Sequence, residues 1–235
     1  MANWITANYV FVGDKDDVDA LYDKLKEIEK TADPNKGGDF ETHWLGLVVE
    51  TLGGNVKKIP CHGEWYDLRK HNGRVYFNTD TANGTSNGVM DLICEYFESL
   101  KYFYRHDGDY PSTNDKNGKY LDRFKIELST PNDENYKGKQ FEGEKYFKTK
   151  EEAFKWVSET IGRPVTSKED IEDISDKWEY SDEGLEMGHV YFTEFEYCSR
   201  EDELGSRFFQ DMFWQSQFSE EVVEEEKDDS EEESD

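Results

Sequence analysis

Residues 64–79 have the sequence Glu-Trp-Tyr-Asp-Leu-Arg-Lys-His-Asn-Gly-Arg-Val-Tyr-Phe-Asn-Thr, and this stretch decides the fold that we predict. Its two ends, 64–69 and 74–79, are rich in aromatic and β-branched residues, which are typical of strands. Between them, Asn72-Gly73 is a strong signal for a tight hairpin turn, because both residues tolerate positive φ. We therefore predict two adjacent antiparallel strands here.

A strand and a helix precede this hairpin. Residues 7–13 have strand composition and end at Gly13. Residues 14–17 then supply a cap and first-turn negative charges for a helix. The apolar residues of that helix recur on one face: Val18, Leu21, Leu25 and Ile28. A short buried helix is predicted over 43–52.

A second helix and further strands follow the hairpin. The helix carries an apolar stripe made of Val89, Ile93, Phe97 and Leu100. Residues 101–105 and 121–128 are predicted strands, joined by a turn at 113–118. The order strand, helix, strand, strand, helix, strand predicts an α+β chain with a ferredoxin-like (split βαβ) antiparallel sheet and helices on one face. A regularly alternating α/β fold is disfavoured because the hairpin interrupts the alternation.

The rest of the chain predicts a C-terminal α/β extension and an acidic tail. Thr149 and Glu152 form a capping box that begins a helix, and another helix is expected after Ser167. Residues 189–197 alternate like a strand. The tail, 219–235, has eleven acidic residues and one lysine, a composition typical of disorder. The predicted division is a domain over 1–165, an extension over 166–218 that packs on it or forms a partner surface, and the tail.

The composition excludes several classes of protein. The 235 residues include 55 Asp and Glu against 28 Lys and Arg, a net charge of −27, which disfavours direct binding to nucleic acid or to anionic membranes. Aromatic residues make up 15%, far more than a disordered chain needs, so most of the chain is expected to fold. The sequence has no membrane-length apolar run and no leader pattern. Its three scattered cysteines, Cys61, Cys94 and Cys198, suit a reducing cytoplasm.

No catalytic or metal-binding set can be recognised. Cys61 and His62 are adjacent, but no second ligand pair stands at zinc spacing. Residues 113–118 are similar to the first half of a calcium loop, yet Thr113 and Phe124 stand where the two anchoring carboxylates would be. Phosphate-loop and nucleophile-elbow motifs are also lacking. We therefore predict a protein that is not an enzyme and has no cofactor or metal.

The N-terminal residues Met1-Ala-Asn3-Trp4, with Asn8 and Gly13 before an amphipathic helix, resemble the YubB-type ferredoxin-like domain family of plasmids and phages. Further similarity lies in four segments: 75–82, 100–104, 113–120 and 145–154. The resemblance covers about residues 1–160, the size of an ordinary domain. It implies the same fold and a mobile-element origin, hence the cytoplasm of a bacterial host, and it implies no activity.

The first functional hypothesis is an acidic phage- or plasmid-type binding protein that inhibits a host defence or nucleic-acid-binding protein. Its negative surface would imitate nucleic acid and occupy a basic surface of that host protein. The aromatic anchors predicted for this contact are Phe208, Phe209, Phe213 and Trp214. The acidic contact residues are Glu220, Glu221, Glu224, Glu225, Glu226, Asp228 and Asp229. The plainer interpretation is that the charges give solubility and the aromatic residues form the core.

The alternative is a small-molecule or nucleotide-binding, sequestering module, or an enzyme without a recognisable motif. A ferredoxin-like sheet with an aromatic face can bind a flat ligand. The residues predicted to hold the ligand are four arginines in or beside strands: Arg69, Arg74, Arg105 and Arg123. Arginines that converge on one site favour this alternative, whereas arginines paired with surface carboxylates count against it. The oligomeric state is not predicted.

Overall fold

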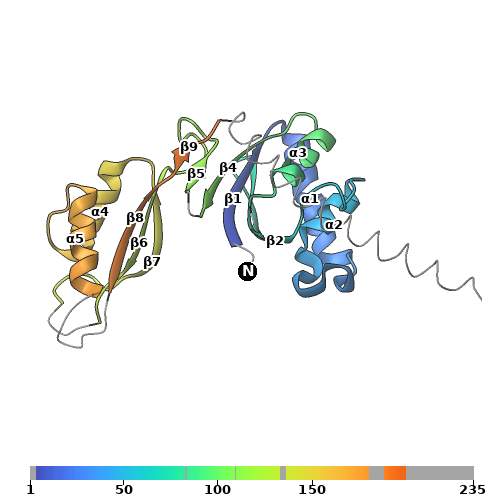
Figure 1. Ribbon diagram of the computed structural model, residues 1–235. Helices are drawn as coiled ribbons and strands as arrows, with labels where there is room; N and C mark the ends of the chain where they lie inside the picture. The colour runs from blue at the N-terminus through green and yellow to red at the C-terminus, as the bar shows by residue number, and fades with distance from the viewer. Residues whose placement is uncertain (1–3, 83, 109, 133–135, 180–187, 200–235) are drawn as a thin grey trace, which may run out of the picture. The chain divides into compact units, whose positions relative to one another are not determined.

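The computed structural model describes residues 4–82, 84–108, 110–132, 136–179 and 188–199 (Figure 1). Helices and strands are both present, so the predicted α+β class is confirmed. The described residues divide into two compact units: those of 4–108 with 198–199, and those of 110–197. Each unit has a hydrophobic core of its own.

The first unit begins with a strand and a long helix and contains the predicted hairpin. In chain order its elements are β1 (Trp4–Val12), α1 (Lys15–Thr31), the 3-10 segment η1 (Pro34–His43), α2 (Leu45–Thr51), β2 (Gly63–His71), β3 (Arg74–Ala82), α3 (Asn87–Tyr96) and β4 (Lys101–Asp107). The hairpin turn has positive φ at Asn72 (50°) and Gly73 (67°), as Asn-Gly predicts.

The strands β2, β3, β1 and β4 lie side by side in that order, and each neighbouring pair is antiparallel. The central strand β1 pairs on both edges, so that Tyr9 lies opposite Phe77 on β3 and Tyr104 on β4. Helices α1, α2 and α3 lie against one face of this sheet (Figure 1). The predicted inward residues of α1 are all buried there: Val18, Leu21, Leu25 and Ile28.

The second unit is built on a smaller antiparallel sheet. Its elements are β5 (Ser112–Thr113), β6 (Phe124–Ser129), β7 (Glu142–Phe147), α4 (Lys150–Ile161), α5 (Lys168–Glu179), β8 (His189–Glu194) and β9 (Glu196–Tyr197). Strand β6 lies between β7 and β8, while β5 and β9 form a short parallel pair. The predicted capping box is present at the start of α4, with Thr149 and Glu152 bonded to each other's backbone N–H.

The boundary between the two compact units lies near residue 110, whereas the sequence predicted a boundary at residue 165. That boundary falls between α4 and α5, yet Val157 and Ile174 from these helices share one core with Ile126 of β6. The predicted strand 121–128, expected beside the first sheet, corresponds to β6, the central strand of the second sheet. Alternating apolar residues indicate a strand but not its pairing partners, which lie far away in sequence. No helix in the described ranges has both the length and the apolarity that a membrane crossing requires.

Candidate ligand-binding face

The first sheet has a second face, away from α1, α2 and α3, which we call the helix-distal face (Figure 1). Side chains alternate between the two faces of a strand, and directly opposite residues of antiparallel strands point to the same side. In β3 the odd-numbered residues from Val75 to Thr81 are buried. The even-numbered ones, from Arg74 to Asp80, therefore belong to the helix-distal face.

Strand register arranges the helix-distal face in four rows. The first row has Glu64, Asp80, Thr6 and Asp107, and the second has Tyr66, Asn78, Asn8 and Arg105. The third has Arg69, Tyr76, Val10 and Phe103, and the fourth has His71 opposite Arg74 and Val12 opposite Lys101. Charge therefore changes along the strands, from three carboxylates at one end to arginine and lysine at the other.

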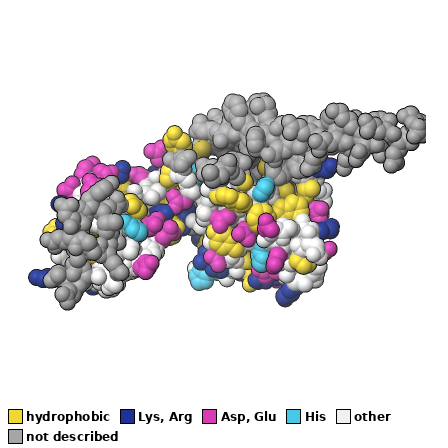
Figure 2. Space-filling view, turned by 60° about the horizontal axis from the view of Figure 1, so that its bottom comes forward, with side chains coloured by type: hydrophobic (Ala, Val, Ile, Leu, Met, Phe, Trp, Pro, Cys, Tyr) yellow, Lys and Arg dark blue, Asp and Glu magenta, His cyan; other side chains and the backbone are white. Residues whose placement is uncertain are grey.

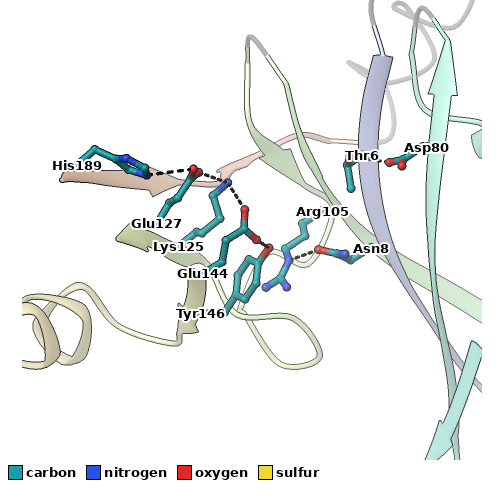
Figure 3. Close-up of polar contacts among 9 residues, drawn as sticks. All are labelled: Thr6, Asn8, Asp80, Arg105, Lys125, Glu127, Glu144, Tyr146 and His189. Atoms are coloured by element: carbon teal, nitrogen blue, oxygen red, sulfur yellow. Dashed lines mark hydrogen bonds and ion pairs between the residues drawn. The ribbon is translucent and has the colours of Figure 1, made fainter. Parts of the chain in front are cut away.

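A line of hydrogen bonds crosses all four strands in the second row, and we call it the amide ladder. Arg105 Nε donates to Asn8 Oδ1 at 2.8 Å, and Asn8 Nδ2 donates to Asn78 Oδ1 at 2.8 Å (Figure 3 draws the first of these bonds). Asn78 Nδ2 then donates to Asp67 Oδ2 at 3.2 Å. Asp67 has a φ of 55° and lies at the register shift between Tyr66 and Arg69, so a β-bulge accompanies the last ladder contact. The ladder fixes the orientation of both amides.

The acidic end of the face is organised around Asp80. Its Oδ1 accepts hydrogen bonds from Thr6 Oγ1 at 2.6 Å (Figure 3) and from Tyr66 OH at 3.3 Å. Burial, together with the nearby Asp80 carboxylate, raises the pKa of Tyr66 to about 12. Tyr66 therefore remains a neutral hydrogen-bond donor at physiological pH.

The third row supplies flat apolar groups beside the cations. Tyr76 and Phe103 are half-buried and flank Val10, which is fully buried although it does not belong to the core under the helices. Arg69 lies opposite Tyr76, is exposed, and makes no ion pair with any residue of the described ranges. An aromatic ring next to an arginine suits a ligand that is both planar and negatively charged.

Three of the four arginines predicted for a ligand site lie on the helix-distal face: Arg69 on β2, Arg74 on β3 and Arg105 on β4. Arg123 belongs to the second unit, where its Nη2 lies 3.7 Å from Glu194 Oε1. Four further residues of this face were not predicted: Asn8, Asn78, Tyr76 and Phe103. Each of them alternates along its strand with residues that face the helices, and this alternation is the signal by which the sequence could have placed them on the face.

The predicted partner-binding residues lie outside the described residues. They are Phe208, Phe209, Phe213, Trp214, Glu220, Glu221, Glu224, Glu225, Glu226, Asp228 and Asp229. On the view in Figure 2, the acidic side chains of the described surface are interspersed with basic and neutral ones. On α1, for example, Asp19 is within 3.0 Å of both Lys15 Nζ and Lys70 Nζ. Part of the acidic charge is therefore paired locally.

A second polar cluster lies on the sheet of the second unit. Lys125 is almost fully buried, with its Nζ 3.4 Å from Glu144 Oε1 and 3.8 Å from Glu127 Oε2 (Figure 3). Glu127 also lies 3.6 Å from His189 Nε2, and Tyr146 donates a 2.8 Å hydrogen bond to Glu144. A buried ammonium between two carboxylates is the arrangement expected of a structural ion pair.

The described ranges contain no group of three or more His, Cys, Asp and Glu residues arranged to hold a metal ion. In the 113–118 segment, the Asp115 carboxylate accepts hydrogen bonds from the backbone N–H of Tyr120 and Leu121, at 2.6 and 2.9 Å. This carboxylate therefore stabilises a turn, as the sequence predicts. Burial raises the pKa of Cys61 to about 12, so its thiol stays protonated and unreactive.

Comparison with known protein families, with characterised proteins and with solved structures finds no match for this chain.

Proposed function

We propose that the helix-distal face of the first unit binds a small ligand that carries a planar ring and a negative charge, and that a nucleotide is the class that fits best. The observation that carries this proposal is that Arg69, Arg74 and Arg105, from three different strands, share one sheet face with Tyr76 and Phe103. The protein would bind or sequester this ligand without converting it.

Each row of the face suits one part of a nucleotide. The guanidinium of Arg74 and the ammonium of Lys101 stand at the cationic end, where a phosphate would be attracted. Tyr76 and Phe103 in the next row offer rings for stacking, which contributes about 1–3 kcal/mol per base in proteins that use it. The amide ladder beyond them presents amides, which both donate and accept hydrogen bonds, to the polar edge of a base.

The overall charge of −27 is compatible with such a ligand. A long polyanion meets the summed field of the whole protein, whereas a single nucleotide responds mainly to charges within a Debye length, about 8–10 Å in physiological salt. The local excess of cations at one end of the face therefore matters more than the distant acidic residues. For the same reason, DNA and RNA strands are not expected to bind to this face.

Titration calorimetry of the full chain with nucleoside mono-, di- and triphosphates tests the proposal. Arg74→Gln and Tyr76→Ala should each weaken binding about tenfold or more, because one removes a charge and the other a stacking ring. Lys26→Gln is the matched control, because Lys26 lies on α1 and pairs with Glu29. Absence of binding to all the nucleotides at millimolar concentration, or equal affinities for the three variants, would refute the proposal.

We further propose that the first unit is a ferredoxin-like (split βαβ) domain of the YubB type, from a phage or plasmid that acts in a bacterial cytoplasm. The strand order β2-β3-β1-β4, the antiparallel pairing and the helices on one face support this fold. The origin rests on the sequence resemblance described above. Genes that lie beside this one on phage or plasmid DNA would support it, and a uniformly chromosomal setting would contradict it.

Inhibition of a basic host protein is the second candidate function. Glu169, Glu172, Asp173 and Asp176 are exposed on one stripe of α5, at positions i, i+3, i+4 and i+7. Lys168 and Lys177 pair with two of these carboxylates, which reduces the negative charge that the stripe presents to a partner. A pull-down from host lysate, with the full chain and with a chain lacking 219–235, separates the two candidates. Salt-sensitive capture of one basic protein favours inhibition, whereas nucleotide binding that survives the deletion favours the ligand face.

A further inference from the structure

Trp65 and Thr79 lie directly opposite each other on the side of the first sheet that faces the helices. Their exposed fractions are 1% and 0%, and among the described residues neither Trp65 Nε1 nor Thr79 Oγ1 has a hydrogen-bond partner. Most buried polar groups in native proteins are satisfied, and leaving one unsatisfied costs about 1–3 kcal/mol. One oxygen atom that bonds to both side chains would satisfy this pair.

The surroundings restrict which group could supply this oxygen. The Trp65 ring packs edge-on against Phe77, with centroids 6.3 Å apart, and lies 5.2 Å from the ring of His43. The row continues from Thr79 to Ala7, whose single methyl group takes little space, and then to His106, whose Nδ1 is also buried. Phe77 and Ala7 are apolar, and His43 has its Nε2 3.7 Å from Glu29 Oε1. An ion beside Trp65 Nε1 would lose its hydration against these apolar side chains, whereas a neutral oxygen ligand would lose much less.

We propose that the first unit holds an internal site for one small neutral oxygen ligand, water or a short-chain alcohol, between Trp65 and Thr79. The indole N–H can only donate, so the ligand oxygen accepts a hydrogen bond from Trp65 Nε1. The Thr79 hydroxyl can donate or accept, and it completes the pair. Burial lowers the pKa of His106, so this neighbour is also neutral around pH 7 and supplies no charge to hold an ion. The site lies on the opposite side of the sheet from the helix-distal face and does not depend on the proposed nucleotide.

Nuclear magnetic resonance of the full chain tests whether the ligand is water. The Trp65 indole N–H signal is assigned by its loss in Trp65→Phe, and it should exchange slowly and show a cross-relaxation peak to a long-lived water. That peak should disappear in Thr79→Val and return in Thr79→Ser, which restores the hydroxyl. Titration with ethanol distinguishes the two occupants. A saturable shift of this N–H signal identifies an alcohol as the ligand, and an unchanged signal with the water peak identifies water.

In thermal unfolding, the direction in which the Tm of Thr79→Val changes tests whether a ligand is bound. If a ligand bridges the two groups, Thr79→Val loses a hydrogen bond and its Tm falls. Thr81→Val calibrates this loss, because the equally buried Thr81 hydroxyl donates to Gly84 O at 2.6 Å. If the Thr79 hydroxyl has no partner, removing it relieves a penalty and the Tm rises. A raised Tm for Thr79→Val, or an indole signal without either a water peak or an ethanol shift, would overturn the proposal.

Discussion

Arg105 on β4 donates its Nε hydrogen to the side-chain oxygen of Asn8 on β1, at 2.8 Å, and Arg105 as a whole is only 9% exposed. The acceptor is a neutral amide, so this contact orients the guanidinium without bringing a negative charge to it. The contact therefore joins the stability of the sheet to the electrostatics of the helix-distal face.

Replacing Asn8 with alanine should destabilise the first unit. The substitution removes the acceptor for Arg105 Nε and the donor to Asn78, so the free energy of unfolding should fall by about 1–3 kcal/mol. Thr6→Val is the control, because the exposed bond from Thr6 to Asp80 should be worth less than about 1 kcal/mol. Urea unfolding measures both values, and equal losses would show that the amide ladder has no special weight.

Gly63 should not tolerate a side chain. A Cβ there would lie 2.2 Å from the backbone oxygen of Asp80 and 2.8 Å from Thr81 Cα, so strands β2 and β3 would have to separate. We expect Gly63→Ala to cost about 2–3 kcal/mol, in the range of overpacked substitutions. Gly73→Ala meets no atom within 4 Å and should cost only about 1 kcal/mol for its positive φ. Chemical denaturation of the two variants should give this order, and the reverse order would contradict it.

The capping box of α4 should contribute measurably to the second unit. Thr149→Ala removes the acceptor for Glu152 N–H at 3.2 Å and should cost about 1 kcal/mol. Because Thr149 and Glu152 satisfy each other's backbone, the double alanine variant should lose less than the sum of the single losses. Hydrogen exchange over 150–153 should accelerate in each variant. Strictly additive losses would mean that the two bonds act separately.

The stability of the first unit should decrease as the solution becomes acidic. Burial holds the pKa of His106 below its ordinary value of 6.5, although nearby Asp107 acts in the opposite direction. Below pH 6.5 the unfolded chain therefore binds a proton more readily than the folded one, and stability falls with pH until the folded-state pKa is passed. His106→Gln should flatten the Tm profile between pH 6.5 and 5, while substitution of the exposed His71 should keep the wild-type slope. An unchanged slope in the His106 variant would contradict this assignment.

The two cores should respond separately to mutation. Ile126 is fully buried in the core of the second unit, and Phe77 in the core of the first. Ile126→Ala should cost about 2–5 kcal/mol and accelerate hydrogen exchange within 110–197, leaving the protected amides of β1 and β3 unchanged. Phe77→Ala should give the reverse pattern. If both variants loosen both units equally, the chain unfolds as one cooperative body.

Local signals in the sequence were sufficient for most of the elements but not for the whole arrangement. The Asn72-Gly73 turn, the inward face of α1 and the Thr149 capping box follow from contacts within a few residues, and all three are present. Strand β7 was missed because its residues are mostly exposed and show no apolar alternation. Strand β9 is separated from β8 by the buried Phe195, so the expected single strand over 189–197 is interrupted.

The candidate site was only partly predictable, because local patterns identify its residues but not the pairing of its strands. Arginines beside predicted strands could be found one by one. Whether their side chains share one face depends on the register between the strands, which no local pattern specifies. The amide ladder requires Asn8 and Asn78, seventy positions apart, to lie in the same row. The bulge that accompanies the Asp67 contact changes the phase of β2, so simple alternation fails there.

The central position of β1 has a consequence for synthesis on the ribosome. Strand β1 leaves the ribosome before its partners β3 and β4, so its two edges stay unpaired until residues 74–82 and then 101–107 have emerged. At about 5–20 residues per second, this interval lasts from several seconds to about twenty seconds. During that time an apolar strand with two open edges is exposed to other nascent chains, and an open strand edge is a template for pairing with another chain.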